Sequence, residues 1–146
     1  MKTRTLILLL ACLALGMLAG CSATTDNYVE TVNQIRGDVL EASSDVGSDA
    51  NASKNDIIAS LEDAESEARG AVDELNDIDV PSEAEAGHDE LVAGFEELTK
   101  LLASVREQVE AKSGASAFAE LRSKGAVIDK RIDAAIDQIN SDLGLD

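Results

Sequence analysis

The sequence predicts an all-α protein, an up-and-down antiparallel bundle of four helices that follows a cleaved N-terminal segment. Beyond residue 20, apolar residues recur about every 3.5 positions in four separate stretches, the repeat of helices packed side by side. No stretch alternates apolar and polar residues as a half-buried strand does. Connections containing Ser, Asp, Gly or Pro separate the stretches, and short connections favour antiparallel neighbours.

The first helix is predicted over Asn27–Ser44. Glu30 follows Asn27 by three residues, which is the spacing of a capping box. The apolar seam of this helix is Tyr28, Val32, Ile35, Val39 and Ala42. A connection of Ser, Asp, Gly and Asn residues, 43–53, follows, because such side chains bond to their own backbone in turns.

Pro81 separates the second helix from the third, since proline disfavours helical backbone at the preceding Val80. The third helix is predicted to begin at Ser82, with Glu85 completing a capping box, and to end at Ser113-Gly114. The second seam is Ile57, Leu61, Ala64, Ala68, Ala71, Leu75 and Ile78. The third seam is Ala84, His88, Leu91, Phe95, Leu98, Leu102, Val105 and Val109.

The fourth helix ends near Gly144, a predicted C-cap. Its seam is Phe118, Leu121, Gly125, Ile128, Ile132, Ala135 and Ile139. A glycine inside a helix costs about 1 kcal/mol relative to alanine. We therefore expect Gly70, Gly94 and above all Gly125 to allow close approach of a neighbouring helix.

The first helix is predicted to be the shorter one, at about 27 Å against about 40 Å for the others. Two outcomes follow for the space beyond its end. Either the other three helices leave a groove lined with Ala and Leu, or the long first connection or bending of the helices covers it, which we favour. A longer coiled coil that completes itself as a homodimer is a further alternative.

The N-terminal residues have the layout of a secretory signal peptide, a short cationic start before an apolar run over 6–20. The run ends in Leu18-Ala19-Gly20-Cys21, which resembles the lipobox of bacterial lipoproteins. This resemblance implies cleavage between Gly20 and Cys21 and attachment of lipid, including fatty acyl chains such as palmitate, to Cys21. An ordinary secretory signal and an uncleaved anchor are the alternatives, but a spanning helix needs about 20 apolar residues.

Three parts are therefore predicted: a signal peptide at 1–20, a lipidated tether at 21–26 and a helical domain at 27–146. The domain is expected on the outer face of the cell membrane, held by acyl chains. Cys12 leaves with the signal peptide, so the mature chain has no free thiol and no disulfide. No cofactor is expected besides the covalent lipid on Cys21.

The charge of the chain is strongly negative, with 12 Lys and Arg against 29 Asp and Glu. Residues 21–146 keep ten of these cations and all the acids, a net charge of −19. Such a charge argues against nucleic acid as a partner, which requires a basic face. Acidic residues crowd around the second connection, which antiparallel order places at the anchor end. Repulsion between these acids and anionic lipid would hold the domain off the membrane surface, over the short distance at which salt does not screen charges.

One polar group on a seam is a candidate site, formed by His88 with Glu85 and Asp89. Glu85 and His88 have the spacing of di-iron bundles, but the chain has no second histidine and no metal is expected. We expect His88 to be a partly buried packing or capping histidine, paired with Glu85 or Asp89. A Ser-His-Asp triad would have to use this one histidine. A divalent-cation site among the acids is the less favoured alternative to a solvated face.

Beyond the lipobox, a few short segments carry a second resemblance. They are Asn27-Tyr28-Val29 with Val32-Asn33-Gln34-Ile35, and Val80-Pro81 followed by His88-Asp89-Glu90-Leu91-Val92. On these residues the sequence is similar to uncharacterised small helical lipoproteins of high-GC Gram-positive bacteria. The resemblance implies a helical lipoprotein and implies no activity.

The sequence therefore predicts a non-enzymatic binding or structural module at the cell envelope. Its partners would be the membrane, through the lipid anchor, and a protein of the envelope. The alternative is a carrier or sensor domain that holds a small apolar ligand or lipid between its helices.

Overall fold

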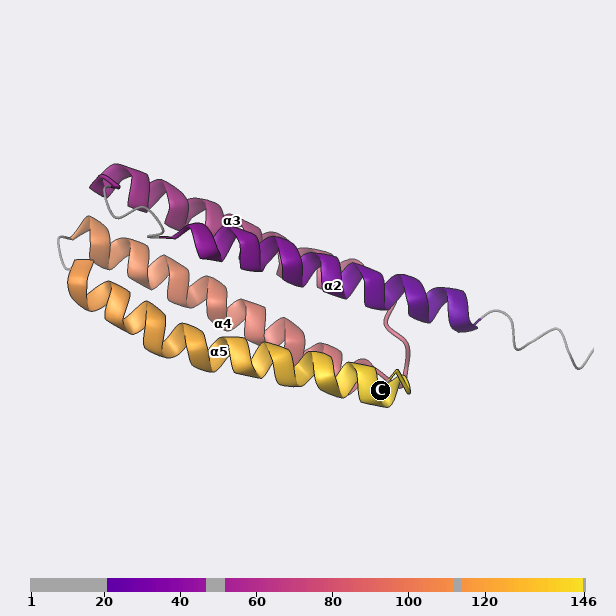
Figure 1. The fold of residues 1–146 in the computed structure, drawn as a ribbon. Helices are drawn as coiled ribbons and strands as arrows, with labels where there is room; N and C mark the ends of the chain where they lie inside the picture. Colours follow the sequence, from indigo (N-terminus) through magenta and orange to yellow (C-terminus); the bar gives the residue numbers. More distant parts are fainter. Residues whose placement is uncertain (1–20, 47–51, 112–113, 146) are drawn as a thin grey trace, which may run out of the picture.

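The computed structural model describes residues 21–46, 52–111 and 114–145, and these residues form four long helices. Figure 1 shows the helices side by side along one axis, each antiparallel to the next. The predicted antiparallel helical bundle is confirmed. The predicted signal peptide, 1–20, lies outside the described residues. The helices are α2 at Cys21–Asp45, α3 at Lys54–Asp77, α4 at Glu85–Glu110 and α5 at Gly114–Asp142.

The apolar seams of the four helices form one core, as the 3.5-residue spacing predicts. Full burial of each large apolar side chain contributes about 1.5–3 kcal/mol. In the described part of the chain, all buried apolar residues lie between Tyr28 and Ile139, so residues 22–146 contain the whole of this core. The largest fully buried side chains are Leu61, Leu75, Leu91, Phe95, Leu102, Val105 and Ile139.

The first helix begins earlier than predicted, at Cys21, and residues 21–26 are helical rather than an extended tether. With 25 residues α2 is not shorter than α3, which has 24, so the prediction of one shorter wall is wrong. No Gly or Pro between Cys21 and Asn27 stops the helix. Asn27 lies in the helix interior and its carbonyl accepts a hydrogen bond from Thr31 Oγ1 at 2.8 Å.

The N-termini of α3 and α4 are capped differently. Ser53 forms a capping box with Asp56: its Oγ accepts from the Asp56 N–H at 3.3 Å, and the Asp56 carboxylate accepts from the Ser53 N–H at 2.9 Å. The predicted capping box at Ser82 is wrong. A turn precedes α4, in which the Ala84 N–H donates to the Pro81 carbonyl at 2.9 Å, and α4 begins after it without a side-chain cap.

Gly144 ends α5 as predicted, with a φ of 69° that glycine adopts without strain. The Leu145 N–H donates to the Asn140 carbonyl at 2.9 Å and the Gly144 N–H to Ser141 at 3.1 Å, which is the Schellman pattern. Figure 1 shows this end of the bundle beside the start of α2 and the connection 78–84. The acidic second connection therefore lies at the same end as Cys21, as antiparallel order predicts.

Two glycines of α4 lie against α5 and allow the backbones to approach closely. A Cβ at Gly87 would lie 2.8 Å from Ile139 Cγ1 and 3.2 Å from the backbone oxygen of Ala135. A Cβ at Gly94 would lie 2.8 Å from Ile132 Cγ1. The expectation for Gly94 is confirmed, and the seven-residue spacing puts both glycines on one face of α4.

The other mid-helix glycines do not serve close packing. A Cβ at Gly70 or Gly125 would meet no atom of a neighbouring helix within 4 Å, so the expectation that these two glycines allow close approach is wrong. For Gly125 the reason is that α2 and α5 stand apart. Among the described residues, no Cα of α2 lies within 8 Å of a Cα of α5, whereas α2 packs on α3, α3 on α4 and α4 on α5. The bundle therefore has one open side.

Gly87→Ala is expected to destabilise the bundle by about 1–3 kcal/mol, because the new methyl group overpacks against α5 backbone that cannot move away cheaply. Gly70→Ala is the matched control and is expected to stabilise the fold by up to about 1 kcal/mol, since it raises helix propensity in open space. Urea unfolding of both variants measures the two changes. Equal effects in the two variants would contradict the close packing of α4 on α5.

Candidate functional site

An apolar cleft of about 230 Å³ lies on the open side of the bundle. Residues of α2 and α5 form its two walls and residues of α4 form its floor. Its lining is mostly apolar, with charged and hydroxyl groups from α2 and α5 among it. The apolar lining residues are Val39, Leu40, Phe95, Leu98, Leu102, Leu121, Gly125, Ala126, Ile128 and Ile132.

The cleft arises because side chains do not fill the space between α2 and α5. Gly125 projects no side chain into the space, and Leu121 beside it is only partly buried although it lies on the predicted seam. Leu40 lies outside the seam of α2 and is 50% exposed. The cleft therefore lies beside α2, whereas the groove considered from the sequence lay beyond the end of a shorter first helix, which α2 is not.

The cleft has polar groups at both ends. At one end, the Arg36 guanidinium of α2 forms an ion pair with the Asp133 carboxylate of α5. From this pair, Ser43 lies about 10 Å further along α2, and Arg122 lies about 16 Å along antiparallel α5 in the same direction. Ser43 and Arg122 therefore both lie toward the other end of the cleft, offset by about 6 Å along the helix axes.

The two groups at that end lack partners within the structure. Ser43 Oγ is buried and makes no hydrogen bond to any described residue. A buried hydroxyl without a partner is unusual and costs about 1–3 kcal/mol. Arg122 is exposed and, within the described ranges, forms no ion pair. This end of the cleft therefore offers a hydroxyl and a guanidinium to a ligand.

His88 lies elsewhere, in the core between α2 and α4. Its Nδ1 and the Tyr28 hydroxyl form a buried hydrogen bond of 3.0 Å, and the two rings lie 5.8 Å apart at 49°. Desolvation lowers the pKa of His88, an effect opposed by the Leu75 backbone and by the charge of Asp89. Burial raises the pKa of Tyr28 to about 12. Both groups are therefore neutral near pH 7, and the pair ties α2 to α4.

The predicted partners of His88 lie on the surface. Glu85 and Asp89 are both exposed, while His88 is 6% exposed. Asp89 affects the pKa of His88 through its charge alone. The side-chain hydrogen bond to the imidazole that was expected from a carboxylate is made by the Tyr28 hydroxyl. The structure thus does not bring His88, Glu85 and Asp89 together as one polar site.

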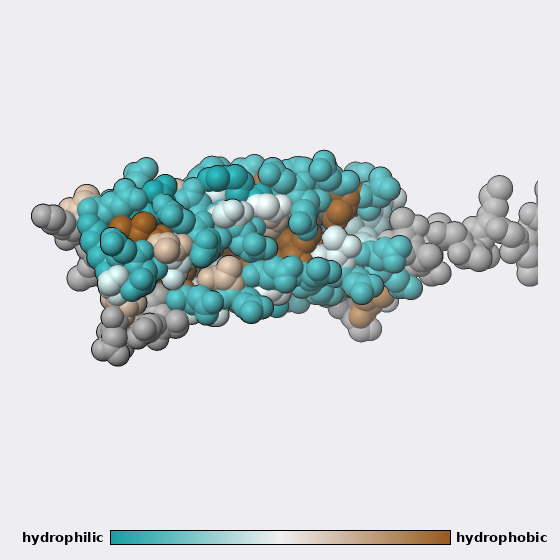
Figure 2. All heavy atoms as spheres, turned by 90° about the horizontal axis from the view of Figure 1, so that it is seen from above, coloured by the Kyte–Doolittle hydropathy of each residue, from teal (hydrophilic) through white to brown (hydrophobic). Residues whose placement is uncertain are grey.

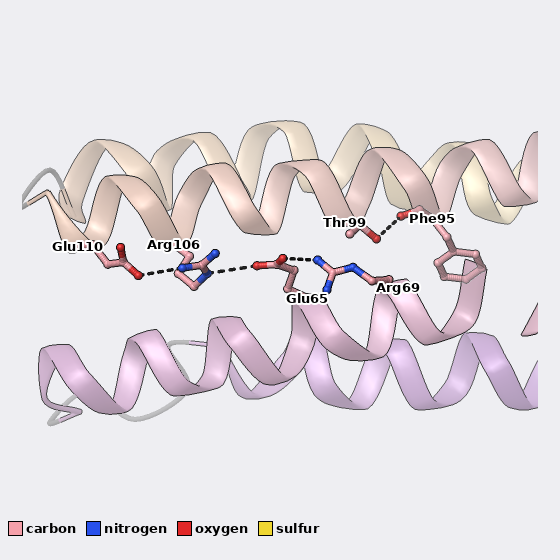
Figure 3. Close-up of polar contacts among 6 residues, drawn as sticks. All are labelled: Glu65, Arg69, Phe95, Thr99, Arg106 and Glu110. Atoms are coloured by element: carbon pink, nitrogen blue, oxygen red, sulfur yellow. Dashed lines mark hydrogen bonds and ion pairs between the residues drawn. The ribbon is translucent and has the colours of Figure 1, made fainter. Parts of the chain in front are cut away.

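Glu65 of α3 is the second buried polar residue of the described chain, 9% exposed. Its carboxylate accepts from Arg69 Nη2 at 2.6 Å and from Arg106 Nε of α4 at 3.2 Å. Arg106 also donates to Glu110 at 2.9 Å, and Figure 3 shows the four side chains in one row along the two helices. These acceptors raise the pKa of Arg106 above its ordinary value. The row is a structural network, because every charge in it has a partner.

The acidic surface offers no metal site within the described residues. No group of three or more His, Cys, Asp or Glu side chains there is placed to hold a metal ion. Figure 2 shows one long face of the bundle, where polar residues cover most of the surface and apolar ones appear in a strip between them. None of the described helices has an apolar stretch long enough to cross a membrane.

No family model, curated protein or solved structure matches this chain. The site must therefore be argued from its own chemistry. Sequence reasoning missed Arg36, Ser43 and Arg122 as cleft residues, because none of them lies on a seam. One signal could have found the cleft: Leu40 directly after Val39 widens the apolar stripe of α2 beyond the 3.5-residue repeat.

Burial of His88 makes the folding stability of the protein depend on pH in a defined range. Because the folded-state pKa of His88 lies below its ordinary value of 6.5, the unfolded chain binds the proton more tightly. Stability is therefore full above about pH 6.5 and falls as the pH drops through 6.5 toward the folded-state pKa. The melting temperature should fall between about pH 7.5 and 5.5 in the wild type, and the fall should be smaller in His88→Gln. Parallel curves for the two proteins would contradict the burial of a neutral imidazole.

Proposed function

We propose that this protein is a lipid-anchored, non-enzymatic binding module on the outer face of the cell membrane, and that its cleft between α2 and α5 holds a small apolar ligand. The cleft carries this proposal. An opening of about 230 Å³ is larger than the cavity of about 150 Å³ that takes up benzene in another protein. Concave, mostly apolar sites with a few polar groups are where small molecules bind.

The positions of the titratable groups support the proposal of a non-enzymatic role. His88 is sealed in the core against Tyr28, so a substrate in the cleft does not reach its ring. The charged groups that line the cleft are Arg36, Arg122 and Asp129, of which Arg36 is paired with Asp133.

The anchor and the cleft are well separated along the bundle. The cleft begins at Arg36, 15 residues after Cys21, which is about 22 Å along α2. If Cys21 carries the lipid, the cleft stands clear of the bilayer surface and exchanges its ligand with the solvent outside. The acidic connection 78–84 at the anchor end favours the same placement, because like charges repel within about 8 Å in physiological salt.

Cys21→Ala is expected to abolish lipid attachment and to move the protein from the membrane to the soluble fraction. The reason is that the thioether forms on the cysteine sulfur and acyl chains alone hold the domain. Detergent phase partition and mass spectrometry of the N-terminus measure both effects. Ser22→Ala is the neighbouring control and should remain in the membrane; release of both variants would contradict the assignment of Cys21.

Gly125→Leu is expected to fill the cleft and to weaken the binding of a neutral apolar fluorophore, N-phenyl-1-naphthylamine, by about tenfold, through loss of the space for the probe. Gly70→Leu is the matched control, because it too replaces a mid-helix glycine with open space around it. Fluorescence titration of residues 22–146, with folding checked by circular dichroism, gives the affinities. No binding to the wild type, or equal loss in both variants, would contradict a ligand in the cleft.

A further inference from the structure

We infer that the ligand of the cleft is an anionic amphiphile of the fatty acid type, with its carboxylate at Arg122 and Ser43 and its chain lying toward Phe95 and Ile132. This inference rests on the proposed function and adds the chemical class and the orientation of the ligand. Three observations carry it: the polarity of the cleft, the partners that its charges already have, and its size.

The cleft is mostly apolar, with charged groups at both ends and Asp129 between them, so an amphiphile needs one of the two ends for its head group. The end at Arg36 is closed by the ion pair with Asp133, so both of these charges are already neutralised. At the other end, Ser43 Oγ is buried without a partner and Arg122 has none among the described residues. A ligand head group at this end would accept from both donors.

The sign of the head group follows from the charges along α5. Arg122 offers a guanidinium, which binds carboxylates through paired hydrogen bonds. Asp129 lies seven residues further on, about 10 Å along the helix, and also lines the cleft. An anion at Asp129 would be repelled, whereas an anion at Arg122 would be attracted, so an anionic ligand has one favourable orientation.

The size of the cleft sets the length of the chain. A volume of about 230 Å³ is about half as large again as the 150 Å³ that accommodates the six carbons of benzene, which corresponds to about nine carbons. From Arg122 to the closing pair at Asp133 the cleft measures about 16 Å along α5. A chain of roughly 8 to 12 carbons therefore fits with its polar head at the mouth.

The test compares three amphiphiles with the same 12-carbon chain: dodecanoate, dodecanol and dodecylammonium. Each displaces N-phenyl-1-naphthylamine from residues 22–146, and its affinity follows from the displacement. Residues 22–146 have a net charge of −19, so general electrostatic attraction favours the cation. Tighter binding of dodecanoate than of dodecylammonium would therefore require a local cationic group.

Arg122→Gln is expected to weaken dodecanoate binding by about three- to tenfold and to leave dodecanol unchanged, because a hydrogen-bonded charge pair at an exposed site is worth about 1 kcal/mol. Lys130→Gln is the matched control: it removes the same charge from an exposed position of α5 that does not line the cleft. Ser43→Ala should also weaken dodecanoate selectively. Light scattering of the wild type and Gly125→Leu shows whether a second copy of the chain occupies the cleft instead.

The possible outcomes separate the inference from the function on which it rests. Preference for dodecanoate that is lost in Arg122→Gln and kept in Lys130→Gln supports the inference. Binding of all three amphiphiles without preference, or equal effects of the two substitutions, overturns the inference and leaves an apolar cleft. A dimer that Gly125→Leu dissociates overturns it in favour of self-association. Failure of the fluorophore to bind the wild type overturns the proposed function itself.

Discussion

Close packing of α4 against α5 determines how the other helices are arranged. Gly87 and Gly94 let the two backbones approach until Ile139 and Ile132 lie where side chains would otherwise stand. Because α4 also packs on α3, and α3 on α2, the helices form a series with α2 and α5 at its two ends. A bundle whose two outer helices are fixed by different neighbours does not have to close, and the open side between α2 and α5 is the result.

Two long side chains connect α2 to helices on which it does not pack closely, one to α4 through the core and one to α5 across the open side. The hydroxyl of Tyr28 reaches His88 on α4, and the guanidinium of Arg36 reaches Asp133 on α5. These two contacts lie at Tyr28 and Arg36, so they hold the part of α2 up to Arg36 against the bundle. The cleft occupies the next stretch of α2, from Arg36 to Ser43. The cleft thus follows directly along α2 from the two side-chain contacts.

The sequence predicted the class of fold and most of the core, but not the width of the gap between α2 and α5. Seam positions depend on periodicity alone, and residues such as Val32, Leu91 and Ile128 are buried as expected. Whether a mid-helix glycine serves close packing depends on the neighbouring helix, so the pattern ranked Gly125 above Gly94 and the structure reverses that order. Sequence reasoning also paired the one histidine with nearby carboxylates, because it has no access to a contact between residues 60 positions apart.

Because the domain is strongly negative, the head group of the inferred ligand contributes selectivity and its chain contributes most of the affinity. A net charge of −19 repels any anion that approaches from a distance, although salt screens this repulsion beyond about 8 Å. Arg122 attracts an anion only at short range, and its exposure to water limits that gain to about 1 kcal/mol. Burial of the chain gives about 0.8 kcal/mol for each CH₂ group, so the apolar walls must supply most of the affinity. The guanidinium and the Ser43 hydroxyl then decide which amphiphile binds and which way it points.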